Sequence, residues 1–386
     1  MRRIVIEGWR GMHHSYALVA QSHALCLLGR ADLDLRYRDL PLFSEHWRHT
    51  GGVFTPEQER RIAAIPSAVD TFAPDVTWSL RPEVPDFTDP VVGCRMVFGT
   101  PECRVLPRVV VERYGNAAKL SPSIGVVTPS RWTAAAYERF GFDAQRVHVV
   151  PHGVDPDVMR PDEHARIAAR QALKADDAFV FMSIGAMTPN KGIGMLLAAF
   201  GMVAEHHPHA RLVLKGADAL YPSQDFLRSA LLALPSGVRE RVASRLLYQG
   251  KTLSTRQMAT FMQAADCYVA PYIAEGFNMP VLEAAACGVP VIVTAGGPTD
   301  EFTTPSFADY VQSAIVPASL PDGQAGEALA PDRDHLIGLM KAAVADPQGM
   351  RRRGAAGARH VHAHFTWEAM TERLLGAFRQ HAPATL

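Results

Sequence analysis

Short runs of β-branched and other apolar residues alternate with longer amphipathic stretches along most of the chain. Such alternation is typical of strand-helix-strand units that assemble into parallel sheets. In the first half the pattern predicts strands at residues 3–7, 33–37, 75–80, 95–98, 124–127 and 147–150. It predicts helices over residues 15–29, 104–119 and 130–140.

A proline-containing stretch at residues 151–164 separates this half from a second alternation. Strands are expected there at residues 178–185, 210–216, 245–250, 267–272 and 289–294, with a helix over 191–207 and a helix-rich end from 332 to 380. The sequence thus predicts an α/β protein of two doubly wound, Rossmann-like domains, residues 1–155 and 156–365. Because doubly wound sheets bind ligands at the carboxyl ends of their strands, the two domains would face a central cleft.

Composition and charge narrow the classes of function. The 386 residues include 39 Lys and Arg against 39 Asp and Glu, so the formal net charge is zero. That balance argues against a broad contact with nucleic acid. The N-terminus lacks the apolar stretch of a signal peptide, and five scattered cysteines are typical of buried reduced thiols. A cytoplasmic protein is expected.

Two glycines follow the first predicted strand. Gly8 and Gly11 precede a helix, but they lack the three-glycine spacing of a dinucleotide fingerprint, which disfavours a dehydrogenase. A glycine loop can still let a phosphate approach the amides at a helix N-terminus. The alternative is a tight strand-to-helix turn with no ligand.

The second half begins with IGAMTPNKGIG, which superficially resembles a phosphate loop. Asn190 and Gly192 stand where that loop needs Gly and Ser or Thr, so a phosphate-loop kinase or ATPase is disfavoured. Lys191 at the start of a helix could nevertheless hold a diphosphate. A second lysine, Lys215, ends the next strand at the same sheet edge, which weakens the alternative that Lys191 is merely a solvated residue at a turn.

The stretch APYIAEGFNMPVLEAAACGVPVIVT, residues 270–294, is the most informative. Glu275 and Glu283 lie eight residues apart, about 12 Å if the chain between them is helical. Carboxylates at that distance could bind the hydroxyls of a sugar and of a ribose at the two ends of a diphosphate. The loop of Gly276, Phe277, Asn278 and Met279 would then present backbone amides to the phosphates.

This stretch closely resembles the E-x7-E signature of retaining GT-B glycosyltransferases of family 4, the group 1 transferases. Further segments stand in the family's order, namely TPSRWTAAAYERFGF, VVPHGVDPDVMRP, IGAMTPNKG, RLVLKG and FTWEAMTERL. The resemblance implies that Glu275 contacts the donor sugar, Glu283 the nucleotide ribose and Lys191 the diphosphate. The family often has Arg where this chain has Ala186, and Lys215 is the candidate to supply the missing charge.

The resemblance implies transfer of a sugar from a UDP- or GDP-sugar to a carbohydrate or lipid-linked acceptor, with retention of anomeric configuration, as in polysaccharide biosynthesis. No cofactor or metal is expected, because lysines would replace the metal and the histidine clusters at 206–209 and 360–364 lack ligand partners. Two alternatives stay open. One is a nucleotide-sugar epimerase or hydrolase on the same fold, and the other is a non-catalytic nucleotide-sugar-binding protein.

The first domain is expected to carry the acceptor. The segment FGTPECRVLP resembles one that family members place at the cleft, which makes Glu102 a candidate contact for the donor sugar or the acceptor hydroxyl. A helix-start carboxylate is the alternative. The resemblance also implies that the helix of residues 366–386 packs back on the first domain. The run Arg351–Arg353 is either a solvated helix face or a peripheral contact with the inner face of the membrane.

Overall fold

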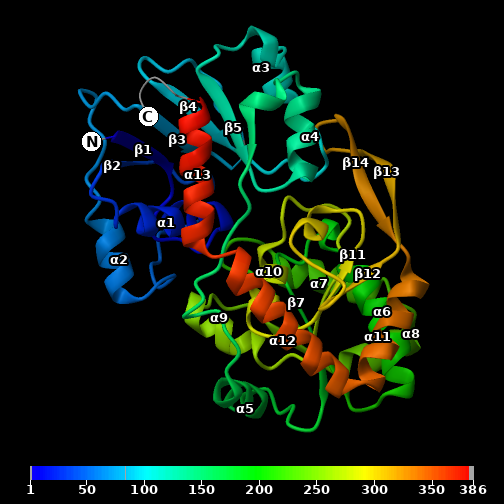
Figure 1. Cartoon of the computed structure of the whole chain (residues 1–386). Coiled ribbons are helices and arrows are strands. Elements are labelled where there is room, and N and C mark those ends of the chain that lie inside the picture. The colour runs from blue at the N-terminus through cyan, green and yellow to red at the C-terminus, as the bar shows by residue number, and fades with distance from the viewer. Residues whose placement is uncertain (1, 83, 382–386) are drawn as a thin grey trace. The chain divides into compact units, whose positions relative to one another are not determined.

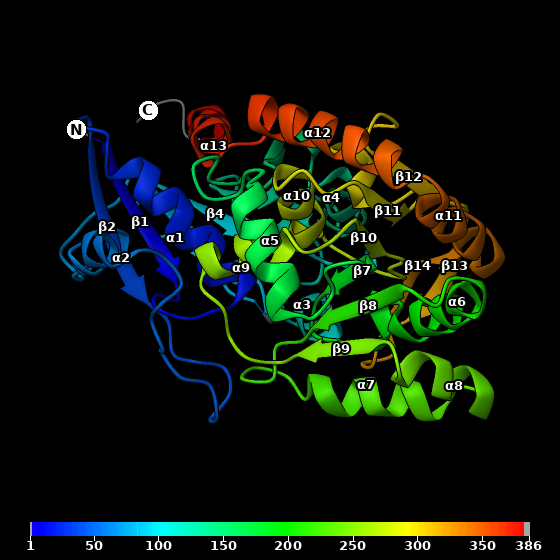
Figure 2. The ribbon, with the colours of Figure 1, turned by 90° about the horizontal axis from the view of Figure 1, so that it is seen from below.

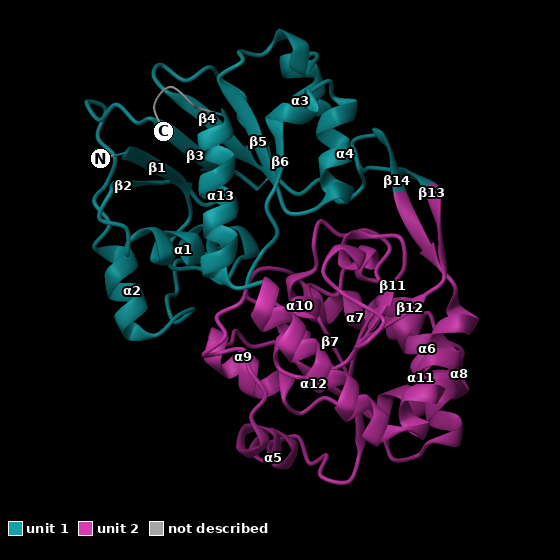
Figure 3. Cartoon of the chain, in the orientation of Figure 1, with its two compact units in different colours: residues 1–153, 317–327, 365–386 teal, residues 154–316, 328–364 magenta. Residues whose placement is uncertain are grey.

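The computed structural model describes residues 2–82 and 84–381. The chain forms two compact units (Figure 3). The first unit contains residues 1–153, 317–327 and 365–386, and the second contains residues 154–316 and 328–364. Each unit is built around its own six-stranded parallel sheet, which confirms the expected pair of doubly wound domains.

The first sheet contains all six strands that the apolar runs predicted. They are β1 (Arg2–Gly8), β2 (Leu33–Asp39), β3 (Val76–Leu80), β4 (Cys94–Phe98), β5 (Ile124–Thr128) and β6 (Val147–Val149). Their order in the sheet is β2-β1-β3-β4-β5-β6. The direction in which the chain adds strands therefore reverses between β1 and β3, and ligands of doubly wound sheets bind at such a switch point.

Helices cover both faces of the first sheet. They are α1 (Ser15–Leu27), α2 (Pro56–Ala63), α3 (Arg108–Tyr114), α4 (Arg131–Arg139) and α13 (Trp367–His381). The expected helix over 104–119 is wrong in its extent. Arg104 has a φ of 56°, a left-handed conformation that cannot continue into a right-handed helix, and α3 begins only after Pro107.

The C-terminal helix α13 packs against α1 within the first unit, as Figure 1 shows. Trp78 of β3 lies beneath both helices, with ring centroids 5.3 Å from His23 of α1 and 6.2 Å from Phe378 of α13. His23 Nδ1 and Thr371 Oγ1 are hydrogen-bonded at 2.8 Å. The last helix of the chain is therefore part of the core of the first unit.

The second sheet has the order β12-β11-β10-β7-β8-β9, and Figure 2 shows these strands side by side. Its strands are β7 (Phe179–Ile184), β8 (Ala210–Lys215), β9 (Leu246–Gln249), β10 (Cys267–Ala270), β11 (Val291–Thr294) and β12 (Ala308–Val311). The edge strand β12 was not predicted. The switch point of this sheet lies between β7 and β10.

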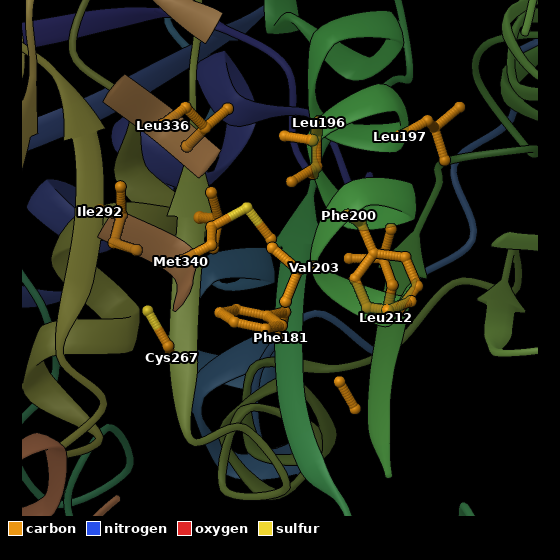
Figure 4. Packing of buried hydrophobic residues seen from close by; sticks show 14 of the residues in the cluster. Phe181, Leu196, Leu197, Phe200, Val203, Leu212, Cys267, Ile292, Leu336 and Met340 are labelled. Carbon is orange, nitrogen blue, oxygen red and sulfur yellow. The ribbon is translucent and has the colours of Figure 1, made fainter. Parts of the chain in front are cut away.

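The helices of the second unit lie around this sheet, and part of them bury an apolar core against it. They are α5 (Glu163–Ala172), α6 (Ile193–His206), α7 (Ser223–Leu232), α8 (Ser236–Ala243), α9 (Thr255–Met262), α10 (Met279–Ala286), α11 (Arg333–Ala345) and α12 (Pro347–His364). Phe181 and Leu212 of the sheet pack against Leu196 and Phe200 of α6 and Met340 of α11 (Figure 4). Burial of each such side chain contributes about 1.5 to 3 kcal/mol.

Across the described residues, every helix is too short or too polar to span a bilayer.

A hairpin that the sequence did not predict follows β12. Its strands are β13 (Ser313–Ser319) and β14 (Ala325–Pro331), and residues 317–327 belong to the first unit. Asp322 in the hairpin turn accepts a hydrogen bond from the backbone N–H of Arg108 at 2.7 Å, at the start of α3. The tip is therefore anchored on the first unit.

The buried histidines of the first unit predict a loss of stability in acid. Burial lowers the pKa of His23 to about 3, and burial with a smaller effect of His23 lowers the pKa of His152 to about 3. An unfolded histidine titrates near pH 6.5, so the folded state loses stability progressively from about pH 6.5 down to about pH 3. At pH 5 each histidine should cost about 2 kcal/mol in the free energy of unfolding. Urea denaturation at pH 7.5 and pH 5 measures this loss, and the His23→Gln variant should show a smaller one; an equal loss would contradict the assignment.

Candidate active site

The loop after β7 and the loop after β10 meet at the switch point of the second sheet. Gly192, the residue before α6, has a φ of +70°, and a Cβ on it would lie 1.9 Å from the carbonyl oxygen of Pro271. The carbonyl oxygen of Asn190 accepts a hydrogen bond from the N–H of Ile273 at 2.7 Å. This close approach places Lys191 beside the loop that carries the first candidate carboxylate.

Lys191 and Glu275 form an ion pair at 2.8 Å, with side chains 22% and 8% exposed. The sequence assigned these residues to the diphosphate and to the donor sugar, and the structure brings them together at the expected edge of the sheet. The pair neutralises a carboxylate that is almost entirely buried. A negatively charged ligand could share the ammonium of Lys191, because that group is the more exposed partner.

The loop between the two carboxylates is rigidly packed. Phe277 is buried and stacks on Phe302 with ring centroids 4.5 Å apart. Asn278 has a φ of 74°, an uncommon left-handed conformation for a residue with a side chain, and α10 begins at the next residue, Met279. The first N–H groups of a helix have no partner within it, so Gly276 to Met279 lead into a place where backbone donors can meet an anion.

Glu283 lies on α10 and is partly buried. In the part of the chain that the structure describes, no hydrogen bond or ion pair is formed by its carboxylate, and burial raises its pKa to about 7. The charges of Glu275 and Glu283 add to the effect of burial in raising the pKa of Tyr268, so both carboxylates lie near that side chain. A carboxylate held in this way favours a ligand that donates hydrogen bonds, such as a diol.

Tyr268 was missed by sequence reasoning because it stands in an apolar strand and reads as core. Its hydroxyl accepts a hydrogen bond from the N–H of Ile184 at 3.1 Å and donates to the carbonyl oxygen of the same residue at 3.2 Å. These bonds join the end of β7 to β10 directly below the switch point. Asn190, whose carbonyl ties the two loops, was noted only as a departure from the phosphate loop.

Lys215 lies at the end of β8, with its side chain 6% exposed. Burial lowers its pKa, an effect opposed by Asp218, and its Nζ donates a 2.6 Å hydrogen bond to the carbonyl oxygen of Gly216. Its own carbonyl oxygen accepts from the N–H of Gly185, the residue before Ala186. The lysine thus belongs to the same sheet edge as the residue that departs from the family pattern.

The two glycines of the first unit have structural roles. Gly8 ends β1, and Gly11 has a φ of +66°. The N–H of Gly11 donates to Gln21 Oε1 at 2.9 Å, and its carbonyl oxygen accepts from the N–H of Thr50 at 2.8 Å. These bonds stabilise the strand-to-helix turn and occupy the N–H of Gly11, while the expected approach of a ligand to the amides at the N-terminus of α1 stays a prediction.

Glu102 lies on a strongly braced segment of the first unit. Its carbonyl oxygen accepts a hydrogen bond from Trp132 Nε1 at 2.7 Å. The carbonyl oxygen of Cys103 accepts from the N–H of Glu327 at 2.9 Å, and the carboxylate of Glu327 pairs with Arg104 at 2.7 Å. Strand β14 of the hairpin therefore holds the backbone that carries Glu102. Glu102 belongs to the first unit and Glu275 to the second.

A metal ion bound by a protein needs several ligating side chains grouped close together. Over 2–82 and 84–381, no three His, Cys, Asp or Glu side chains are grouped so that they could hold an ion. Metal independence stays a prediction.

Residues 178–328 match the family described as glycosyl transferases group 1. D-inositol 3-phosphate glycosyltransferases are 28% identical over 243 residues in Segniliparus rotundus and 32% over 247 residues in Mycobacterium avium; each match covers 62% of this chain. The matched parts are 48% and 50% of those proteins, so the chain spans about half the length of these relatives.

Solved structures match over almost the whole chain. The Anabaena protein HepE in complex with UDP and glucose has a TM-score of 0.72 at 15% identity, covering 97% of this chain and 99% of that one. Sucrose-phosphate synthase from Thermosynechococcus elongatus has a TM-score of 0.67 at 18% identity, with full coverage of both chains. The chain thus has the two-unit fold of GT-B glycosyltransferases, and its residues 178–328 match the family of glycosyl transferases group 1.

Proposed function

We propose that this protein transfers a sugar from a nucleotide-diphosphate sugar to a hydroxyl of an acceptor, with retention of anomeric configuration. The observation that carries the proposal is the arrangement at the second switch point. There Glu275, paired with Lys191, and a second carboxylate, Glu283, both lie near Tyr268, and the Glu283 carboxylate has no hydrogen-bond or ion-pair partner among the described residues. The complexes of HepE with UDP and with UDP-glucose support a uridine diphosphate sugar as the donor.

Each group has a role in this proposal. Glu283 accepts hydrogen bonds from the ribose hydroxyls, Lys191 and Lys215 with the amides of the 276–279 loop bind the diphosphate, and Glu275 binds hydroxyls of the sugar. Positive charge placed where the leaving diphosphate develops its charge lowers the barrier to bond cleavage. The lysines supply that charge, so the proposed reaction proceeds without a metal.

The bond changes follow from retention. The bond between the anomeric carbon and the diphosphate oxygen breaks, and the acceptor oxygen bonds to the same face of the sugar. The proton of the acceptor hydroxyl passes to the departing phosphate oxygen. Glu102, on its braced segment of the first unit, is proposed to orient the acceptor hydroxyl or the sugar. The acceptor is a carbohydrate, polyol or lipid-linked sugar, and the name of the mycobacterial relatives supports a polyol.

We expect the carboxylate of Glu283 to lower the stability of the ligand-free protein and to raise its affinity for the nucleotide. Its raised pKa means that ionisation above pH 4.5 costs folding free energy, so Glu283→Gln should stabilise the ligand-free protein at pH 8 by about 1 to 3 kcal/mol. The same variant should bind UDP about tenfold more weakly, because it loses hydrogen bonds to a charged acceptor. Thermal unfolding and calorimetric titration measure the two effects. Inorganic pyrophosphate, which has no ribose, is the control ligand and should bind both proteins equally.

The pH dependence of UDP binding gives a second test of the same residue. The ribose hydroxyls donate to the ionised carboxylate, so UDP affinity should rise from pH 6 to pH 8 in the wild type as Glu283 loses its proton near pH 7. The dependence should flatten in Glu283→Gln. A parallel rise in both proteins would place the titrating group elsewhere.

Glu275→Gln should separate sugar contact from nucleotide contact. The variant loses its charge next to Lys191 and its strongest acceptor for sugar hydroxyls, so turnover should fall about a hundredfold or more while UDP affinity changes less than about threefold. Steady-state rates and UDP titration check this split. A large loss of UDP affinity with unchanged turnover would reverse the roles assigned to the two carboxylates.

The reaction class is tested by incubation with UDP-glucose in the presence and absence of polyol and sugar acceptors. Acceptor-dependent release of UDP is expected, and NMR of the product should show the α linkage of the donor retained. A β-linked product would refute retention. Turnover without any acceptor would favour the epimerase or hydrolase alternative, and binding without turnover would favour the non-catalytic one.

A further inference from the structure

One face of the first sheet is unexpectedly polar near its switch point. Glu7 of β1 is in register with Arg38 of β2 and with Ser79 of β3, so these three side chains share a face. Farther along the same row, Val97 and Val126 are apolar and pack under α3 and α4. The polar residues therefore occupy a part of the sheet face where an apolar core would be expected.

These residues belong to a network of charges. The Glu7 carboxylate is 3% exposed and is reached by Arg38 at 2.6 Å, Arg95 at 3.1 Å and Arg81 at 4.0 Å. Arg95 and Arg81 also approach Asp86, at 3.5 and 3.7 Å. Three guanidinium groups thus face two carboxylates, and this cluster of described residues has an excess of one positive charge.

The cluster has more donors than its own acceptors satisfy. The buried Nε groups of Arg81 and Arg95 and the buried hydroxyl of Ser79 have no hydrogen-bond partner among the described residues. Leaving such donors unpaired costs free energy, and a bound anion that accepts hydrogen bonds from the cluster would recover part of that cost. The side chains of Arg38 and Arg81 are 41% and 38% exposed, so an anion can reach the cluster from solvent.

The position of the cluster is that of a ligand site. Glu7 immediately precedes the end of β1, and Arg81 immediately follows β3, the two strands between which the strand order reverses. Guanidinium groups match the tetrahedral, multiply charged oxygens of a phosphate better than they match a neutral hydroxyl. We propose that the cluster of Glu7, Arg38, Arg81, Arg95 and Asp86 binds a phosphate monoester carried by the acceptor. This inference rests on the proposed function, because it assigns the acceptor to the first unit.

Inorganic phosphate is the probe for this site. Calorimetric titration is performed with UDP at saturation, so that the phosphate-binding groups of the second unit are already occupied. The wild type should bind phosphate saturably, and the double variant Arg38→Gln/Arg81→Gln should bind it at least about tenfold more weakly. Both arginines are partly exposed, so their replacement opens no core cavity. Arg36→Gln is the matched control, because Arg36 lies on the same strand, is 32% exposed and pairs with Asp34.

A gain of affinity separates a binding site from a merely structural network. Asp86→Asn removes one negative charge and should tighten phosphate binding about threefold, whereas an internal ion network would only lose stability. Absence of saturable phosphate binding in the wild type, or equal binding by the double variant, would overturn the proposal. UDP affinity in the same variants tests the donor site independently. In the Arg38→Gln/Arg81→Gln variant, unchanged UDP affinity with lost phosphate binding is the expected result. In the wild type, UDP binding without any phosphate binding would refute this inference while leaving the proposed function standing.

Discussion

The contact between Gly192 and the carbonyl oxygen of Pro271 sets the geometry on which the second unit depends. No side chain fits there, so the first turn of α6 can approach the loop after β10 closely enough for Lys191 to meet Glu275. The hydrogen bond from Ile273 to Asn190 and the Tyr268 hydroxyl hold the two loops at that distance. A parallel sheet brings the carboxyl ends of its strands to one edge, but this contact decides which side chains face one another there.

Both units bury charged side chains at positions where an apolar side chain would cost less free energy. In the second unit Glu283 is held in surroundings that favour its protonated form, and Lys215 is buried and donates a hydrogen bond to the carbonyl oxygen of Gly216. In the first unit Glu7 is nearly inaccessible among arginines. Each costs folding free energy that a well-packed apolar residue would not, which is the pattern expected where stability is traded for a ligand.

Much of this architecture could be predicted from the sequence, because short runs of β-branched residues are typical of buried strands in parallel sheets. Prediction from the hydrophobic pattern failed where the backbone conformation of single residues decides where an element begins. The stretch 104–119 has helical composition, but the left-handed Arg104 delays the helix to residue 108. The hairpin at 313–331 lacks strong strand signals, and it forms hydrogen bonds with distant segments, from Glu327 to Cys103 and from Leu329 to Ile273. The cluster around Glu7 could not be foreseen, because its partners lie 31 and 88 residues away and appear in the sequence as scattered surface arginines.

The first unit consists of three segments that are separated in the sequence, residues 1–153, 317–327 and 365–386, and these segments leave the ribosome at different times. Trp78 is covered by Phe378, and the segment of Glu102 is braced by Glu327, so the first 153 residues emerge from the ribosome without two of the parts that complete their unit. The whole of the second unit, which ends at residue 364, is synthesised before α13. The sheet of the first unit therefore keeps an incompletely covered apolar face until α13 emerges, and this unit, whose strands precede the second unit in the chain, completes its folding after the second unit has been synthesised.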